Sequence, residues 1–150
     1  MRPPYAYRKS GSLKPRTVRS NPEHKLQVDV VRYLTYVLPE GALFTASLAG
    51  VHLGAMQRDK ASAAGLRPGW PDLQLVWDRQ MFFIELKKPL TAVPRDRGRL
   101  GTLDDPGLSD DQRDVLYALP VGSWAVCRSV EEVGLALSRW RIPCVPYVWA

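Results

Sequence analysis

Several features typical of other protein classes are scarce or missing in this chain. No apolar run approaches the roughly 18 residues needed to cross a bilayer, so we expect no membrane partner. The two cysteines have no metal-ligand spacing and are too few for a disulfide framework. His24 and His52 are isolated, and no internal repeat, glycine-rich phosphate loop or nucleophile elbow occurs. The N-terminus lacks the apolar segment of a secretory signal, which predicts a cytoplasmic, reducing location.

The positive charge is concentrated at the beginning of the chain. The net charge is +6 over 150 residues, and the first residues contain six basic side chains and no acidic one: Arg2, Arg8, Lys9, Lys14, Arg16 and Arg19. Proline and glycine in this stretch predict a flexible arm over residues 1–19, followed by one domain over residues 20–150. A basic arm on a neutral body suggests a polyanionic partner; an arm that only aids solubility is the alternative.

The most informative segment is residues 69–89, GWPDLQLVWDRQMFFIELKKP. Residues 73–77 and 81–86 are rich in branched and aromatic side chains, which predicts two strands joined as a hairpin. A two-residue turn at residues 78–79 would pair Trp77 with Gln80 and place Asp72 opposite Glu85. One face of this hairpin is then entirely apolar: Leu73, Leu75, Trp77, Phe82, Ile84 and Leu86. A one-residue slip would bury the charges with these side chains, so the pattern itself favours this register.

The opposite face brings Asp72, Glu85 and Lys87 together at one end of the hairpin. Paired carboxylates are hard oxygen ligands suited to Mg²⁺ or Mn²⁺, which polarise a phosphate and lower the pKa of a bound water. Lys87 would orient that water or neutralise charge on the phosphoryl oxygens. The alternative is an ordinary amphipathic hairpin with a solvated polar face, because short Glu-x-Lys triplets are common by chance.

Further elements are predicted on both sides of the hairpin. Ser20 or Asn21 would cap a helix that has Glu23 in its first turn and ends before Pro39, with Glu23 and Gln27 both pointing inward. Capping boxes are predicted at residues 109–112 and 129–132. Strands are expected at residues 43–47 and 124–127, and helices at 55–64, 109–119 and 129–140. The linker from Pro89 to residue 107 is long for a compact domain, which is typical of functional or mobile loops.

This order and these motifs resemble the PD-(D/E)XK nuclease superfamily, and more narrowly its VRR-NUC family of phage and bacterial replication and repair proteins. The resemblance spans residues 20–138 and is carried by Glu23, Gly69, Pro71-Asp72, Glu85-x-Lys87, and Leu108, Ser109 and Gln112. Two departures are the insertion of Trp70 after the glycine and a longer, arginine-containing segment between Lys87 and Leu108. The second leaves the substrate preference open.

The resemblance implies an α/β fold with a restriction-endonuclease-like core. This core is a mixed central β-sheet flanked by helices, in α-β-β-β-α-β order with extra helices. It also implies Mg²⁺- or Mn²⁺-dependent cleavage of DNA, often of branched structures such as flaps or Holliday junctions, by a homodimer. A phage-encoded member would act in the host cytoplasm.

The resemblance also implies a role for each site residue. Asp72 and Glu85 would hold the metal, with the Leu86 carbonyl as a third ligand, and Lys87 would assist the nucleophile. Glu23 would bind a second metal ion or one of its waters, and Gln112, chiefly a capping residue by its position, would orient water or a phosphate. DNA contacts are expected from Arg8, Lys9, Lys14, Arg16, Arg19, Lys88, Arg95, Arg97 and Arg99. The alternatives are a binding module of the same fold with weak catalysis and a phage accessory protein that compacts DNA with its arm.

Overall fold

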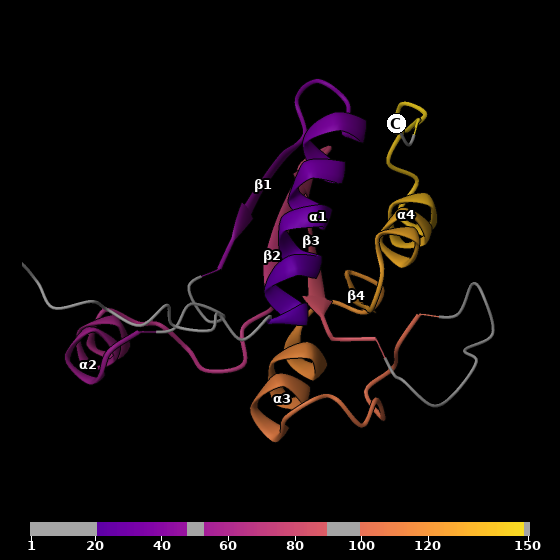
Figure 1. The fold of residues 1–150 in the computed structure, drawn as a ribbon. Helices are drawn as coiled ribbons and strands as arrows, with labels where there is room; N and C mark the ends of the chain where they lie inside the picture. Colours follow the sequence, from indigo (N-terminus) through magenta and orange to yellow (C-terminus); the bar gives the residue numbers. More distant parts are fainter. Residues whose placement is uncertain (1–20, 48–52, 90–99, 149–150) are drawn as a thin grey trace, which may run out of the picture.

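The structure is a computed structural model that describes residues 21–47, 53–89 and 100–148. Within these ranges the chain is an α/β fold in which helices flank one four-stranded mixed sheet (Figure 1). The elements in chain order are α1 (Pro22–Val37), β1 (Leu43–Ala46), α2 (Ala55–Ala63), β2 (Leu73–Trp77), β3 (Gln80–Leu86), α3 (Asp110–Ala118), β4 (Trp124–Cys127) and α4 (Val130–Arg139). The predicted fold class is confirmed at this level, and each predicted element lies close to its expected bounds.

The sheet has the strand order β1-β2-β3-β4. The pairs β1–β2 and β2–β3 are antiparallel, whereas β3 and β4 are parallel. A parallel pair needs a crossover connection, and here α3 lies within it. Helix α3 therefore belongs to the connection between the two parallel strands.

The β2–β3 hairpin has the register that the sequence predicts. Trp77 pairs with Gln80, and the ladder runs to Leu73 opposite Ile84. Asp78 and Arg79 form the turn with φ values of 47° and 62°, and positive φ at both central residues is what a type I′ turn requires. The next position along the ladder places Asp72 beside Glu85.

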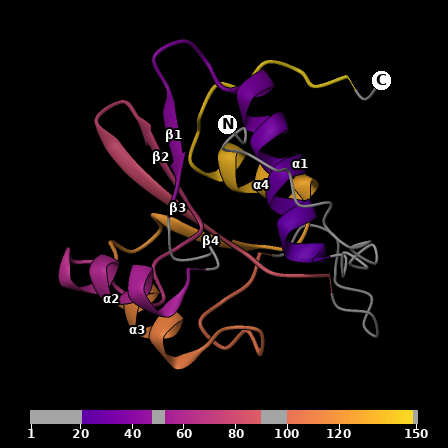
Figure 2. The ribbon, with the colours of Figure 1, turned by 60° about the vertical axis from the view of Figure 1, so that its left-hand side comes forward.

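Helices α1 and α4 cover one face of the sheet, and α3 lies on the other side (Figure 2). The apolar face of the hairpin packs under α1 and α4, where Leu73, Leu75 and Ile84 are completely buried. A smaller cluster under α3 contains Leu108, Leu116 and Val126. Helix α2 contributes no buried residue and lies away from the sheet (Figure 1). The site residues therefore lie where the sheet ends between these two layers.

The helix ends follow the predicted capping chemistry, with one correction. The Asn21 side chain caps α1, accepting the amides of Glu23 and His24, and the capping box that opens α3 is complete. Ser129 caps α4, but the Glu132 carboxylate accepts the amide of Arg128 at 2.7 Å. That is one residue earlier than the capping box predicted, because Arg128 leaves the strand with its amide directed at the first turn of α4.

Three further features concern the cysteines, the helix lengths and the basic segments. Cys127 and Cys144 form no disulfide within the described residues. None of the described helices has the length and apolarity required to cross a bilayer. The basic arm over residues 1–19 and the arginines at 95, 97 and 99 lie outside the described residues.

Candidate active site

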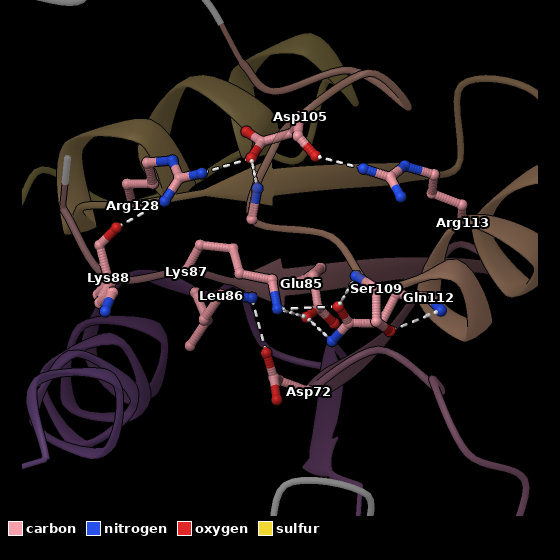
Figure 3. Close-up of polar contacts among 11 residues, drawn as sticks. Asp72, Glu85, Leu86, Lys87, Lys88, Asp105, Ser109, Gln112, Arg113 and Arg128 are labelled. Atoms are coloured by element: carbon pink, nitrogen blue, oxygen red, sulfur yellow. Dashed lines mark hydrogen bonds and ion pairs between the residues drawn. The ribbon is translucent and has the colours of Figure 1, made fainter. Parts of the chain in front are cut away.

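Asp72, Glu85 and Lys87 meet at the end of the β2–β3 hairpin (Figure 3). The Lys87 Nζ atom lies 3.0 Å from Glu85 Oε1, and the Leu86 amide between them donates to Asp72 Oδ2 at 2.7 Å. Glu85 is only 1% exposed. An amphipathic hairpin with a solvated polar face would leave such a carboxylate in water, so that alternative does not describe this end of the hairpin.

Gln112 joins this group from the first turn of α3. Its Oε1 atom accepts the Ser109 amide at 2.9 Å, which completes the capping box, and also accepts Lys87 Nζ at 2.9 Å. Its Nε2 atom donates to Glu85 Oε1 at 2.5 Å. Gln112 therefore closes the capping box and also contacts the candidate site, because its Oε1 atom accepts from both Ser109 and Lys87 while its Nε2 atom donates to Glu85.

Burial controls the electrostatics of the two carboxylates. Loss of solvent, with a smaller contribution from the charge of Asp72, raises the pKa of Glu85 to about 8, and Lys87 opposes this rise. Burial also raises the pKa of Asp72, although the Leu86 amide and Lys87 favour its charged form. Two carboxylates in a shared low-dielectric site disfavour double ionisation. The positive charge of Lys87 is therefore not enough to keep both carboxylates ionised.

Glu23 reaches the same region from the opposite side of a cleft. The cleft has a volume of about 580 Å³ and is lined by Glu23, Asp72 and Leu86 at the hairpin end. Glu23 is exposed at the start of α1, and its charge raises the pKa values of both Asp72 and Glu85. Both Glu23 and Gln27 face the cleft, as their helical spacing predicts.

The donor set can be tested for its fit to a divalent cation. Within the described residues, no three acidic, histidine or cysteine side chains cluster closely enough to hold an ion by themselves. Mg²⁺ seldom needs such a cage, since it binds through one or two carboxylates and keeps waters and substrate phosphates. The charges of Lys87 and Glu23 both act on Asp72 and Glu85, so these four side chains together have a net charge of −2 when all three carboxylates ionise. This charge and the oxygen chemistry fit Mg²⁺ or Mn²⁺.

The loop before α3 is held by a buried ion pair that the sequence analysis missed. Arg128 and Asp105 are 5% and 4% exposed; their side chains are paired, and the guanidinium also donates to the Lys88 carbonyl at 2.6 Å. Asp105 accepts the Gly107 amide at 2.9 Å. A Cβ atom on Gly107 would lie 3.4 Å from Lys87 Cδ and 2.9 Å from Arg128 Nη2. The ion pair therefore fixes the loop that packs against Lys87.

Gly69 allows the loop before Asp72 to pack against α3. Its φ is +80°, and a Cβ atom there would lie 2.5 Å from the Asp111 carbonyl carbon. Trp70 follows and packs edge-on against Phe83, with ring centroids 5.9 Å apart. The glycine before the Pro-Asp pair is thus required by backbone conformation and by space, and Trp70 extends the packing on the α3 side of the sheet.

Replacing Gly69 by alanine is expected to destabilise the fold by about 3 kcal/mol, since positive φ costs roughly 1–2 kcal/mol and the steric clash adds a similar amount. Gly122 is a matched control because its φ is also +80° while nothing lies within 4 Å of its Cβ position. Gly122→Ala should lower the stability only by the cost of placing alanine at positive φ. Chemical denaturation of both variants measures the difference; equal losses would show that Gly69 does not pack tightly on α3.

The raised pKa of Glu85 predicts a pH-dependent effect of Glu85→Gln. An unfolded glutamate has a pKa of about 4.3, whereas the folded value is about 8. The folded state then binds the proton more tightly, so the stability from this group is lost as pH rises from about 4 through 8. Glu85→Gln removes this loss. The quantity to compare is the free energy of unfolding of the variant minus that of the wild type, measured in a metal chelator. This difference should be larger at pH 9 than at pH 5 by on the order of 1 kcal/mol or more.

Thermal unfolding at both pH values provides the measurement, and Glu131→Gln is its control. Glu131 is an exposed carboxylate in the first turn of α4. Its replacement should alter stability by a similar amount at both pH values. A stability difference between wild type and Glu85→Gln that does not change with pH would contradict the assigned electrostatics.

Of the residues predicted to contact DNA, Lys88 lies in the described part of the chain. Lys88 is exposed immediately after Lys87, and its carbonyl accepts the Arg128 guanidinium. The other residues predicted to contact DNA lie outside the described ranges, so their contribution stays a prediction.

Comparison with protein-family models, with curated proteins and with solved structures finds no significant match for this chain. The chemistry of the described residues is therefore the basis on which a function is inferred.

Proposed function

We propose that this chain is a metal-dependent endonuclease that hydrolyses phosphodiester bonds in DNA. The observation that carries this proposal is the convergence of buried Glu85 with Asp72 and Lys87 at one end of a hairpin. We further infer a restriction-endonuclease-like core and membership of the VRR-NUC type within the PD-(D/E)XK superfamily. The expected substrates are branched DNAs, such as flaps or Holliday junctions, in phage or bacterial replication, recombination or repair.

The carboxylates would supply the protein ligands of a divalent cation. When bound, Mg²⁺ or Mn²⁺ would polarise the scissile phosphate and lower the pKa of a water molecule near it. Asp72 and Glu85 would provide anionic oxygens, with the Leu86 carbonyl as a third ligand. Because the two carboxylates are buried and near each other, a cation would favour the ionised form of both.

Lys87 and Gln112 would act on the phosphate and the nucleophile. The Lys87 side chain is only 12% exposed and is held between Glu85 Oε1 and Gln112 Oε1. A preorganised ammonium loses little energy to reorganisation when charge develops on a phosphoryl oxygen. The Gln112 amide, fixed by its bonds to Ser109 and Glu85, would orient a water or a phosphate oxygen.

Positive charge elsewhere in the chain would bind the DNA backbone. Six basic residues in the first twenty, with Lys88 and the arginines at 95, 97 and 99, would supply sequence-independent and salt-dependent affinity. By the resemblance to stand-alone members of the VRR-NUC family, we expect two copies of the chain to act together.

A catalytically weak nucleic-acid-binding module of the same fold is the alternative function. It would use the same basic residues, but it gives no reason to bury Glu85 beside Asp72 and Lys87. Purified protein with Mg²⁺ or Mn²⁺, incubated with duplex, flap, splayed and four-way-junction DNA, distinguishes the two. Metal-dependent cleavage supports the nuclease, and binding without cleavage of any substrate supports the module.

Asp72→Asn and Lys87→Ala are expected to reduce cleavage at saturating DNA by at least about a hundredfold. The first removes an anionic ligand while keeping an acceptor for the Leu86 amide, and the second removes the counter-charge at the phosphate. Single-turnover cleavage measures both effects.

Exposed residues of the same types provide the controls. Asp78→Asn changes a carboxylate at the hairpin turn, and Lys60→Ala changes a lysine on the solvated surface of α2. Neither should alter the rate. Wild-type cleavage by either site variant would remove that residue from the chemistry.

Glu23→Gln separates a role in the site from a favourable position at a helix start. A first-turn carboxylate contributes roughly 0.3–1 kcal/mol through the helix dipole, and Glu131 of α4 is in an equivalent position. Both substitutions should lower the melting temperature by a similar small amount, but only Glu23→Gln should slow cleavage, by about tenfold or more. If both variants cleave at the wild-type rate, Glu23 serves the helix alone.

A further inference from the structure

The cleft beside the carboxylates extends along α1 beyond the atoms that the proposed chemistry uses. Its volume of about 580 Å³ lies in the range of pockets that bind small organic groups. Away from the hairpin end, its walls are Val28 and Val31 of α1 and Ala46 of β1. Nothing in the proposed hydrolysis explains why an apolar space adjoins Asp72.

The charge of the lining indicates what the cleft can accept. Within the described residues, the charged side chains that line it are Glu23 and Asp72, and no lysine or arginine does so. A phosphate placed along these walls would meet like charge and no counter-charge, which is unfavourable in a partly desolvated space. The walls therefore suit an uncharged group that adjoins a phosphate, rather than the phosphate itself.

The remaining lining side chains can recognise a flat, hydrogen-bonding group. His24 is an exposed aromatic ring at the rim, and Val28 beside it is 44% exposed. Gln27 adds an amide that can donate and accept. Aromatic and aliphatic surfaces with a few polar groups are what nucleobases stack on and bond to in single-strand binding sites.

We propose that this cleft receives the base of one unpaired nucleotide of the DNA substrate, next to the phosphate held at Asp72. The inference rests on the proposed nuclease function and gives its substrate class: DNA that is single-stranded at the position adjoining the cut. A base inside a duplex stays stacked and paired, and it would have to leave the helix at a cost of a few kcal/mol to enter. Among branched DNAs, the cleft therefore favours flaps and splayed arms, whose unpaired strand adjoins the cut, over duplexes and four-way junctions, in which every base is paired.

Binding to short oligonucleotides tests the proposal without cleavage. Full-length protein in a metal chelator is titrated, by fluorescence anisotropy, into a labelled oligothymidylate of eight or so nucleotides and into an abasic oligomer with the same number of phosphates. Both ligands carry the same charge, so any contribution from the basic arm is equal. The thymidylate should bind about 5- to 100-fold more tightly, which corresponds to base stacking.

Variants of the cleft assign this preference to its walls. His24→Ala and Val28→Ala should each reduce the preference for the thymidylate several-fold while leaving affinity for the abasic oligomer unchanged. Tyr117→Ala is the matched control, since Tyr117 is an exposed aromatic side chain on α3 outside the cleft lining, and it should retain the full preference. Equal binding of the two oligomers by wild type, or an undiminished preference in both cleft variants, would overturn the proposal.

Failure of the nuclease function would look different. In that case no DNA is cleaved with Mg²⁺ or Mn²⁺, although the base-dependent binding and its loss in His24→Ala persist. If instead a paired duplex is cleaved as fast as splayed DNA and the base preference is absent, the nuclease function is supported and the base-binding role of the cleft is rejected.

Discussion

The two-residue turn between β2 and β3 sets the position of every charged group at the far end of the hairpin. Positive φ at Asp78 and Arg79 closes the turn tightly, and the ladder from Trp77–Gln80 onward leaves one register. Side chains alternate faces along a strand, so a slip by one residue would exchange Glu85 with Leu86 between the core and the site. Packing of the apolar side chains under α1 and α4 fixes the register of the hairpin, and this register places Asp72 and Glu85 at its end.

Burial of Glu85 opposes folding, and the surrounding structure offsets its cost. The carboxylate loses water and lies close to Asp72, and both effects raise its pKa. Lys87 and Gln112 stabilise it directly. Paired and hydrogen-bonded carboxylates of this kind are characteristic of functional sites, where the stability of the fold is partly sacrificed. A bound cation would remove much of the repulsion.

The loop before α3 depends on a second buried charge pair. Asp105 and Arg128 are desolvated together, and removing one partner would leave the other uncompensated, which typically costs 3–5 kcal/mol. The pair holds the Lys88 carbonyl on one side and the turn from Asp105 to Gly107 on the other, directly before the capping box that contains Gln112. The site is thus fixed both by the hairpin register and by this ion pair, which lies above Glu85, Lys87 and Gln112 in Figure 3.

The sequence predicts those features that local periodicity and turn chemistry determine. Period-two alternation and a short turn leave one hairpin register, and helical spacing places Glu23 and Gln27 on one side of α1. The Asp105–Arg128 pair joins residues 23 positions apart, and no local pattern distinguishes it from surface charges. A Glu-x-Lys triplet likewise has the same sequence whether its glutamate is buried or solvated. The contact of Gly69 with α3 depends on tertiary packing, which no local pattern indicates. The cleft arises from the separation of α1 and β1, which no residue spacing encodes.

The most direct test of the central claim is whether a divalent cation binds at Glu85 and displaces its proton. Isothermal titration of Mn²⁺ at pH 7, in two buffers of different ionisation enthalpy, gives both the affinity and the number of protons released. Because the pKa of Glu85 is raised to about 8 in the metal-free protein, binding to the wild type should release close to one proton. Glu85→Gln should bind more weakly and release almost none. Absence of Mn²⁺ binding, or equal binding and proton release by the two proteins, would contradict a metal site at the end of this hairpin.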